Sequence, residues 1–171
     1  MRRDIEFSNA QGVRLVGRLE LPAGPPRAVA LFAHCFTCTV QSHGTRRISV
    51  ALANHGIATM TFDFTGLGKS QGAFADSHFA ANVSDLIAAA AHLRDTIGAP
   101  SILIGHSLGG AAVIAAAGDI PECTAVVTIG APYDPAHVLH QLGDQVERVR
   151  AQGQAEVTIG GRPFEVSSAF L

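Results

Sequence analysis

The sequence ILIGHSLGGAAVIAA, residues 102–116, is the most informative part of the chain for its architecture. An apolar run typical of a buried strand ends in GHSLG (105–109), and an Ala/Val/Ile run typical of a helix follows at once. Glycines on both sides of Ser107 indicate a sharp strand-to-helix turn, because larger side chains would clash there. We therefore expect the Ser107 hydroxyl to act as a nucleophile, with the Leu108 N–H as one donor of an oxyanion hole. A serine that only caps the helix is the alternative.

The rest of the chain alternates between strand-like and helical segments. Residues 2–9 and 13–20 predict an antiparallel pair of strands at the start. Further strands are predicted at 27–34, 57–64, 100–106 and 123–131, helices at 46–56, 77–97, 107–118 and 135–151, and a hairpin at 155–166 that turns at Gly160-Gly161. This alternation predicts an α/β fold with a doubly wound, mostly parallel sheet of about six strands and helices on both faces.

Local signals at the ends of these segments refine the division of the chain. Gly56 should end the helix at 46–56, and Asp76 should cap the helix at 77–97. We expect residues 1–134 to form the core of the domain and residues 135–171 to form a cap-like helix and hairpin.

Composition and charge exclude several functional classes. Hydrophobic residues make up 47% and charged residues 15% of the 171 residues, as in ordinary globular proteins. The net charge of -2 and the lack of a Lys/Arg cluster argue against nucleic acid as a partner. The chain has no apolar run long enough for a membrane span and no secretory signal, so we expect a cytoplasmic protein without a membrane partner.

The three cysteines are Cys35, Cys38 and Cys123, an odd count that gives no disulfide framework. Cys35 and Cys38 have C-x-x-C spacing, which is also found in redox-active pairs and in half of a metal site. There is no second C-x-x-C, and the surroundings are apolar, so we expect two free thiols rather than a redox pair.

Two more loops follow predicted strands, at the sheet edge where ligands bind in such folds. In AHCFTCT (33–39) the N–H of Phe36 is the best candidate for the second oxyanion donor. FDFTGLGKSQG (62–72) resembles the end of a phosphate-binding loop, but Asp63 and Gln71 stand where phosphate motifs need glycine. We expect a tight turn in which Asp63 accepts hydrogen bonds from loop amides, and no cofactor or metal.

With these loops in order, the chain resembles the α/β-hydrolase family over nearly its whole length. GHSLGG is similar to the family's nucleophile elbow, HCFT to its oxyanion loop, and DFTGLGKS to its D-x-R-G-x-G-x-S turn. More narrowly, FAHCFTCT, FDFTGLGKS and IGHSLGGAA resemble the hydrolase half of bacterial α/β-hydrolase/OsmC fusion proteins. Cys35 stands where the family usually has glycine, and Thr65 where it usually has arginine; neither replaces a catalytic group.

The resemblance implies a truncated form of the fold, because the family places its acid and histidine on loops after later strands. Asp134 follows the strand at 123–131 and is a possible acid, although Asp134-Pro135 is also a good helix start. His137 and His140 lie on the predicted helix that begins there, and either is a possible base or simply solvated. His34 is expected to be a local hydrogen-bonding residue, and His106 is expected to point away from the serine.

These features predict a serine hydrolase that acts on small carboxylic esters or related acyl compounds. The alternatives are a catalytically incomplete half-domain that acts in assembly or binding, and thiol-based redox chemistry at the C-x-x-C. Strand 123–131 would lie unpaired at the sheet edge, and such an edge invites another chain. We therefore expect a homo-oligomer or a complementing chain that pairs there, and an acid and histidine that come from another subunit or from a C-terminal portion absent from this sequence.

Overall fold

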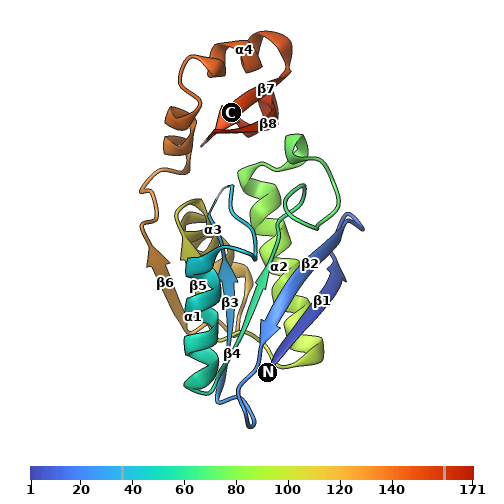
Figure 1. Cartoon of the computed structure of the whole chain (residues 1–171), viewed down its shortest axis with the longest axis vertical. Helices are drawn as coiled ribbons and strands as arrows, with labels where there is room; N and C mark the ends of the chain where they lie inside the picture. Colours follow the sequence, from blue (N-terminus) through green and yellow to red (C-terminus); the bar gives the residue numbers. More distant parts are fainter. Residues whose placement is uncertain (36, 160) are drawn as a thin grey trace.

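The computed structural model describes residues 1–35, 37–159 and 161–171. Its centre is a six-stranded sheet in the order β1-β2-β4-β3-β5-β6, as Figure 1 shows. The strands are β1 (Arg2–Ser8), β2 (Arg14–Glu20), β3 (Ala28–Ala33), β4 (Ile57–Phe62), β5 (Ile102–His106) and β6 (Ala125–Ile129). β1 and β2 form the predicted antiparallel pair, whereas β3, β4, β5 and β6 run parallel. The expected mixed but mostly parallel sheet is confirmed.

Helices cover both faces of this sheet. α1 (His43–Asn54) packs its Ile48 and Leu52 on one face, while α2 (Phe79–Thr96) and α3 (Leu108–Ala116) cover the other (Figure 1). α1 ends just before Gly56, as predicted, and this glycine has the positive φ of 81° that suits the position after a helix.

The prediction that Asp76 caps α2 is wrong. Residues Phe74–Asp76 form a separate 3₁₀ turn, η1, and α2 starts only at Phe79. His78 is the N-cap residue instead, and its Nδ1 accepts a hydrogen bond of 3.2 Å from the Ala81 N–H. Imidazole is an unusual cap, so residue preferences at helix starts favour the nearby aspartate over His78.

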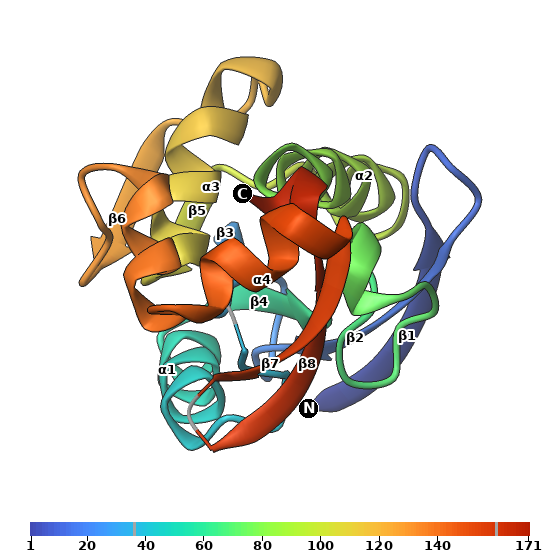
Figure 2. The ribbon, with the colours of Figure 1, turned by 90° about the horizontal axis from the view of Figure 1, so that it is seen from above.

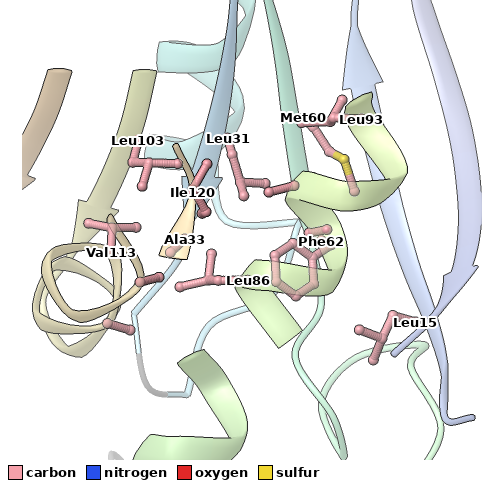
Figure 3. Packing of buried hydrophobic residues seen from close by; sticks show 14 of the residues in the cluster. Leu15, Leu31, Ala33, Met60, Phe62, Leu86, Leu93, Leu103, Val113 and Ile120 are labelled. Carbon is pink, nitrogen blue, oxygen red and sulfur yellow. The ribbon is translucent and has the colours of Figure 1, made fainter. Parts of the chain in front are cut away.

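The main hydrophobic core fills the space between the sheet and α2 and α3. Figure 3 shows Leu31 and Leu103 from the sheet facing Leu86 of α2 and Val113 of α3. All four side chains are fully buried. Burial of a leucine-sized side chain contributes roughly 1.5–3 kcal/mol, so this layer holds β5 and α3 firmly on either side of the turn at Ser107.

The segment after β6 forms a cap, and its predicted single helix at 135–151 is wrong. The chain instead makes a 3₁₀ segment η3 (Pro135–Gln141) and a helix α4 (Gln145–Gln152). The break falls at Gly143, whose φ of 52° is left-handed and cannot continue a right-handed helix. The strands β7 (Gln154–Ile159) and β8 (Arg162–Ser167) form the predicted hairpin, in which Ile159 pairs with Arg162.

This cap lies over the carboxyl ends of the parallel strands, as the view from above in Figure 2 shows. Its buried side chains form a second cluster in which Val149, Val157 and Val166 pack with Leu108 of the main domain. The two clusters therefore meet next to Ser107. No helix in the described part of the chain is long and apolar enough to cross a membrane.

Candidate active site

Ser107 occupies the sharp turn between β5 and α3. It has φ 54° and ψ -126°, and it is the only non-glycine residue with a positive φ among those described. Such a conformation costs of the order of 1–3 kcal/mol and persists only where the surroundings enforce it. The side chain is partly exposed and makes no capping hydrogen bond to α3. The alternative in which this serine merely caps the helix is therefore not supported.

Two glycines allow the chain to make this turn. A Cβ atom on Gly109 would clash with the carbonyl oxygens of Ala33 and His34, at the end of β3. A Cβ atom on Gly105 would clash with the backbone of Gly109 one turn later. The expected tight contact is thus present, and it also brings the start of α3 directly against the loop that follows β3.

The Leu108 N–H is the first amide of α3 and makes no hydrogen bond within the described residues. The first amides of a helix carry partial positive charge and suit a developing oxyanion. Phe36, the candidate for the second donor, lies outside the described residues.

The loop after β4 has the predicted arrangement around Asp63. Its buried carboxylate accepts hydrogen bonds from the Val40 N–H at 2.8 Å and from the Lys69 N–H at 3.0 Å. One side chain thus joins the loop after β3 to the loop after β4. This confirms the expected role of Asp63 as a residue that fixes loop amides, in place of a phosphate site.

A second buried carboxylate, Asp85 of α2, was missed by sequence reasoning. It accepts hydrogen bonds of 2.8 Å from the Asn9 side chain and from the Thr65 N–H. These bonds hold the loop after β4 against α2 and the β1–β2 turn. The only available signal was an acidic residue inside an apolar helical stripe, which is equally typical of a solvated helix face.

Next to Asp63 lies His34, which is fully buried. Its Nδ1 is 2.9 Å from the Cys35 carbonyl oxygen, and its Nε2 is 3.8 Å from Asp63 Oδ1. Burial lowers the pKa of His34, while the Cys35 carbonyl and the Asp63 charge oppose that effect. The interpretation of His34 as a local hydrogen-bonding residue agrees with these contacts.

Asp134, the possible acid, caps η3. Its carboxylate is exposed and accepts a hydrogen bond of 2.9 Å from the Ala136 N–H, with Pro135 at the first position of η3. This is the helix-start role that the sequence offered as the alternative. The described residues include no histidine that is hydrogen-bonded to this carboxylate.

The candidate histidines are exposed and are not hydrogen-bonded to Ser107. His137 and His140 stack edge to face with ring centroids 4.7 Å apart, on an open side of η3. His106 is the exposed last residue of β5. Within the described residues no group of three or more histidine, cysteine or acidic side chains could hold a metal ion.

Cys35 and Cys38 form a disulfide, so the expectation of two free thiols is wrong. The chain turns directly after β3, where the Cys38 N–H donates to the Cys35 carbonyl at 3.0 Å. This turn brings the two Cα atoms to 5.1 Å, within the range that a disulfide requires. Cys123 is a free thiol, as expected.

A cavity of about 430 Å³ lies beside the elbow, which is a common size for a small-molecule site. Leu108, Phe79, Val138 and Leu139 form much of its apolar wall, and Asp134 lies at the same cavity. The apolar hairpin residues Val157, Ile159, Phe164 and Val166 do not line this cavity. The first two and Val166 are instead buried in the cap's own core, and Phe164 packs on Phe74 with ring centroids 4.7 Å apart.

Comparison with known proteins agrees with this geometry. Residues 24–161 match the family described as serine aminopeptidase S33. The esterase domain of a Rhodothermus marinus protein is 46% identical, with a TM-score of 0.75, over 99% of this chain and 66% of that one. A putative hydrolase from Agrobacterium vitis is 18% identical, with a TM-score of 0.79, over 99% of this chain and 70% of that one.

A mammalian structure shares the same fold. The α/β hydrolase domain-containing protein 10 from mouse is 20% identical, with a TM-score of 0.74, over 98% of this chain and 67% of that one. Among curated protein sequences none is significantly similar to the chain. The chain thus spans about two thirds of the length of these solved structures, including 66% of the Rhodothermus esterase domain.

Proposed function

Because the chain belongs to the serine aminopeptidase S33 family of α/β hydrolases, we propose that it is a serine hydrolase with Ser107 as its nucleophile. The observation that carries this proposal is the left-handed backbone of Ser107, with φ 54°, at a turn where its hydroxyl caps nothing. Strain of this kind is typical of functional sites, where it positions a reactive group.

In the proposed reaction the Ser107 Oγ attacks the carbonyl carbon of an ester, and its proton passes to a histidine base. The Leu108 N–H, and in our expectation the Phe36 N–H, hold the negative charge that forms on the carbonyl oxygen. The histidine returns the proton to the leaving alcohol. Water then attacks the acyl-enzyme, and the carboxylic acid and the free Ser107 hydroxyl are regenerated.

We propose a small carboxylic ester as the substrate class. The cavity beside Leu108 has a mostly apolar wall and a size suited to a small molecule. The 46% identity to a protein described as an esterase domain also supports an ester, rather than a peptide, as the substrate. An aminopeptidase would need carboxylates that hold a free amino group, and Asp134 is the only acidic side chain among the described residues that line this cavity.

We further propose that the acid and histidine lie outside residues 1–171, and that another copy or a complementing chain pairs along β6. This strand lies at the edge of the sheet, and Val126 and Val127 are 40% and 46% exposed. Neighbouring residues of a strand face opposite sides, so side chains on both faces of β6 are exposed. If no histidine reaches Ser107, only the residual catalysis of an oxyanion hole remains, of the order of 10³–10⁴ over water.

Hydrolysis of p-nitrophenyl acetate tests the proposal. The wild type should release p-nitrophenol faster than Ser107→Ala, and Ser84→Ala, a partly exposed serine on α2, should retain the wild-type rate. Leucine p-nitroanilide in parallel separates ester from aminopeptidase activity. Equal rates for the wild type and Ser107→Ala would exclude Ser107 as the nucleophile, and a preference for the anilide would exclude the ester as substrate class.

A further inference from the structure

The Cys35–Cys38 disulfide lies at the carboxyl end of β3, in the loop against which the elbow packs. Both cysteines are partly exposed and lie outside the buried core. Attack by a thiolate on a disulfide sulfur requires access to that sulfur. The disulfide therefore differs from a buried structural bridge.

The backbone at this loop does not depend on the disulfide for its course. The Cys38 N–H donates to the Cys35 carbonyl at 3.0 Å, and the Val40 N–H donates to Asp63 at 2.8 Å. Neither of these bonds involves a sulfur atom. The stabilisation that a disulfide gives by restricting the unfolded chain grows with loop length, and a separation of three residues is near its minimum. Stabilisation of the fold therefore does little to explain why this disulfide is present.

The disulfide touches the site through its immediate neighbours. The Cys35 carbonyl oxygen lies 2.9 Å from His34 Nδ1, and the His34 carbonyl oxygen faces Gly109 of the elbow. The Thr37 carbonyl, between the two cysteines, accepts a hydrogen bond from Arg162 of the cap hairpin. Residues next to the two cysteines thus contact both the elbow and the cap.

We propose that Cys35 and Cys38 form a redox-active dithiol–disulfide site whose exchange partner is a small-molecule thiol of the glutathione class, and that its oxidation state sets the activity of Ser107. The second half of this statement rests on the proposed function. In the exchange, a thiolate attacks one cysteine sulfur and breaks the S–S bond, which leaves a mixed disulfide and one cysteine thiolate. A second thiolate releases the other cysteine. Two small thiols thus become one small disulfide, and their two protons end on Cys35 and Cys38.

Thiol counting tests the exchange without any activity measurement. In a Cys123→Ser background, which removes the free thiol, the protein is equilibrated in buffers of reduced and oxidised glutathione and then alkylated. Mass spectrometry should show two alkylated cysteines under reducing ratios, none under oxidising ratios, and a reversible transition between them. Alkylation at every ratio, or a disulfide that persists in excess reduced glutathione, would overturn the proposal.

The same samples are then assayed with p-nitrophenyl acetate. The oxidised and reduced forms should differ at least threefold in rate, and Cys35→Ser/Cys38→Ser should have one rate at all glutathione ratios. A reversible thiol transition with an unchanged rate would overturn the link to Ser107. If Ser107→Ala shows that the proposed hydrolysis is absent, thiol counting still tests whether Cys35 and Cys38 exchange with glutathione.

Discussion

The Nε2 atom of His34 lies 3.8 Å from Asp63 Oδ1, and both side chains are buried. The Cys35 carbonyl can only accept a hydrogen bond, so His34 Nδ1 carries a proton. The separation from Asp63 is too long for a hydrogen bond, and Nε2 has no hydrogen-bond partner among the described residues. Burial lowers the pKa of His34 below its ordinary value of 6.5. The folded protein therefore holds this imidazole neutral at pH values where the unfolded chain binds a proton.

Stability should fall as the pH drops below about 6.5. In this range the unfolded state binds more protons than the folded state, so the free energy of unfolding decreases with decreasing pH. Urea denaturation between pH 8 and pH 5 measures this free energy of unfolding. Because His34 is one of eight histidines in the chain, the quantity to compare is the difference between the wild type and His34→Gln. An identical pH profile for the two proteins would contradict the assignment to His34.

Asp63→Asn should destabilise the protein by about 1–3 kcal/mol. The amide side chain retains one acceptor oxygen, so one of the N–H groups of Val40 and Lys69 would face an NH₂ group instead. The lost charge should also lower the pKa of His34 further, because Asp63 opposes the effect of burial. Asp95→Asn, on an exposed position of α2, is the matched control. Equal urea midpoints for the two variants would show that the Asp63 contacts contribute little to stability.

How far the sequence predicted the structure depended on the range of each interaction. The turn at Ser107 and the contact of Asp63 with the Lys69 N–H were predicted because each signal lies within a few residues, whereas the contact of Asp63 with the Val40 N–H joins two separate loops. The contact between His34 and Asp63 was missed because it forms only when β3 and β4 lie side by side. No pattern within a few residues predicts that pairing. The helix break at Gly143 was missed because apolar residues at helical spacing continue across it, and one glycine costs a helix only about 1 kcal/mol.

The close packing of the elbow predicts opposite effects for two glycine substitutions. Gly109→Ala should destabilise the protein by roughly 1–3 kcal/mol, because its Cβ would clash with the carbonyls of Ala33 and His34. Gly118→Ala, just beyond α3, meets open space and should be neutral or slightly stabilising. Thermal unfolding of both variants measures these two changes in stability. A stabilising Gly109→Ala would mean that the elbow is looser than these contacts imply.

Relief of backbone strain predicts that Ser107→Gly is stabilising by about 1 kcal/mol. Glycine adopts a φ of 54° without the steric cost that serine bears, although it also increases the entropy of the unfolded chain. The same change on a regular helix, Ser84→Gly in α2, should instead destabilise by roughly 0.5–1 kcal/mol. Denaturant titration gives both values. The stabilised Ser107→Gly protein should have lost hydrolysis of p-nitrophenyl acetate, and a loss of stability in this variant would argue that the turn is unstrained.

The edge strand β6 predicts association. An unpaired apolar strand exposes a row of N–H and C=O groups that another strand can pair with, and lysine on an edge prevents such pairing. Light scattering coupled to size exclusion should show the wild type as a dimer or larger species, and Val127→Lys should shift it to the monomer. Val50→Lys on α1 is the control, since Val50 and Val127 are 38% and 46% exposed but lie on different elements. A monodisperse wild-type monomer would refute self-association through β6 and leave a complementing chain as the route to a complete site.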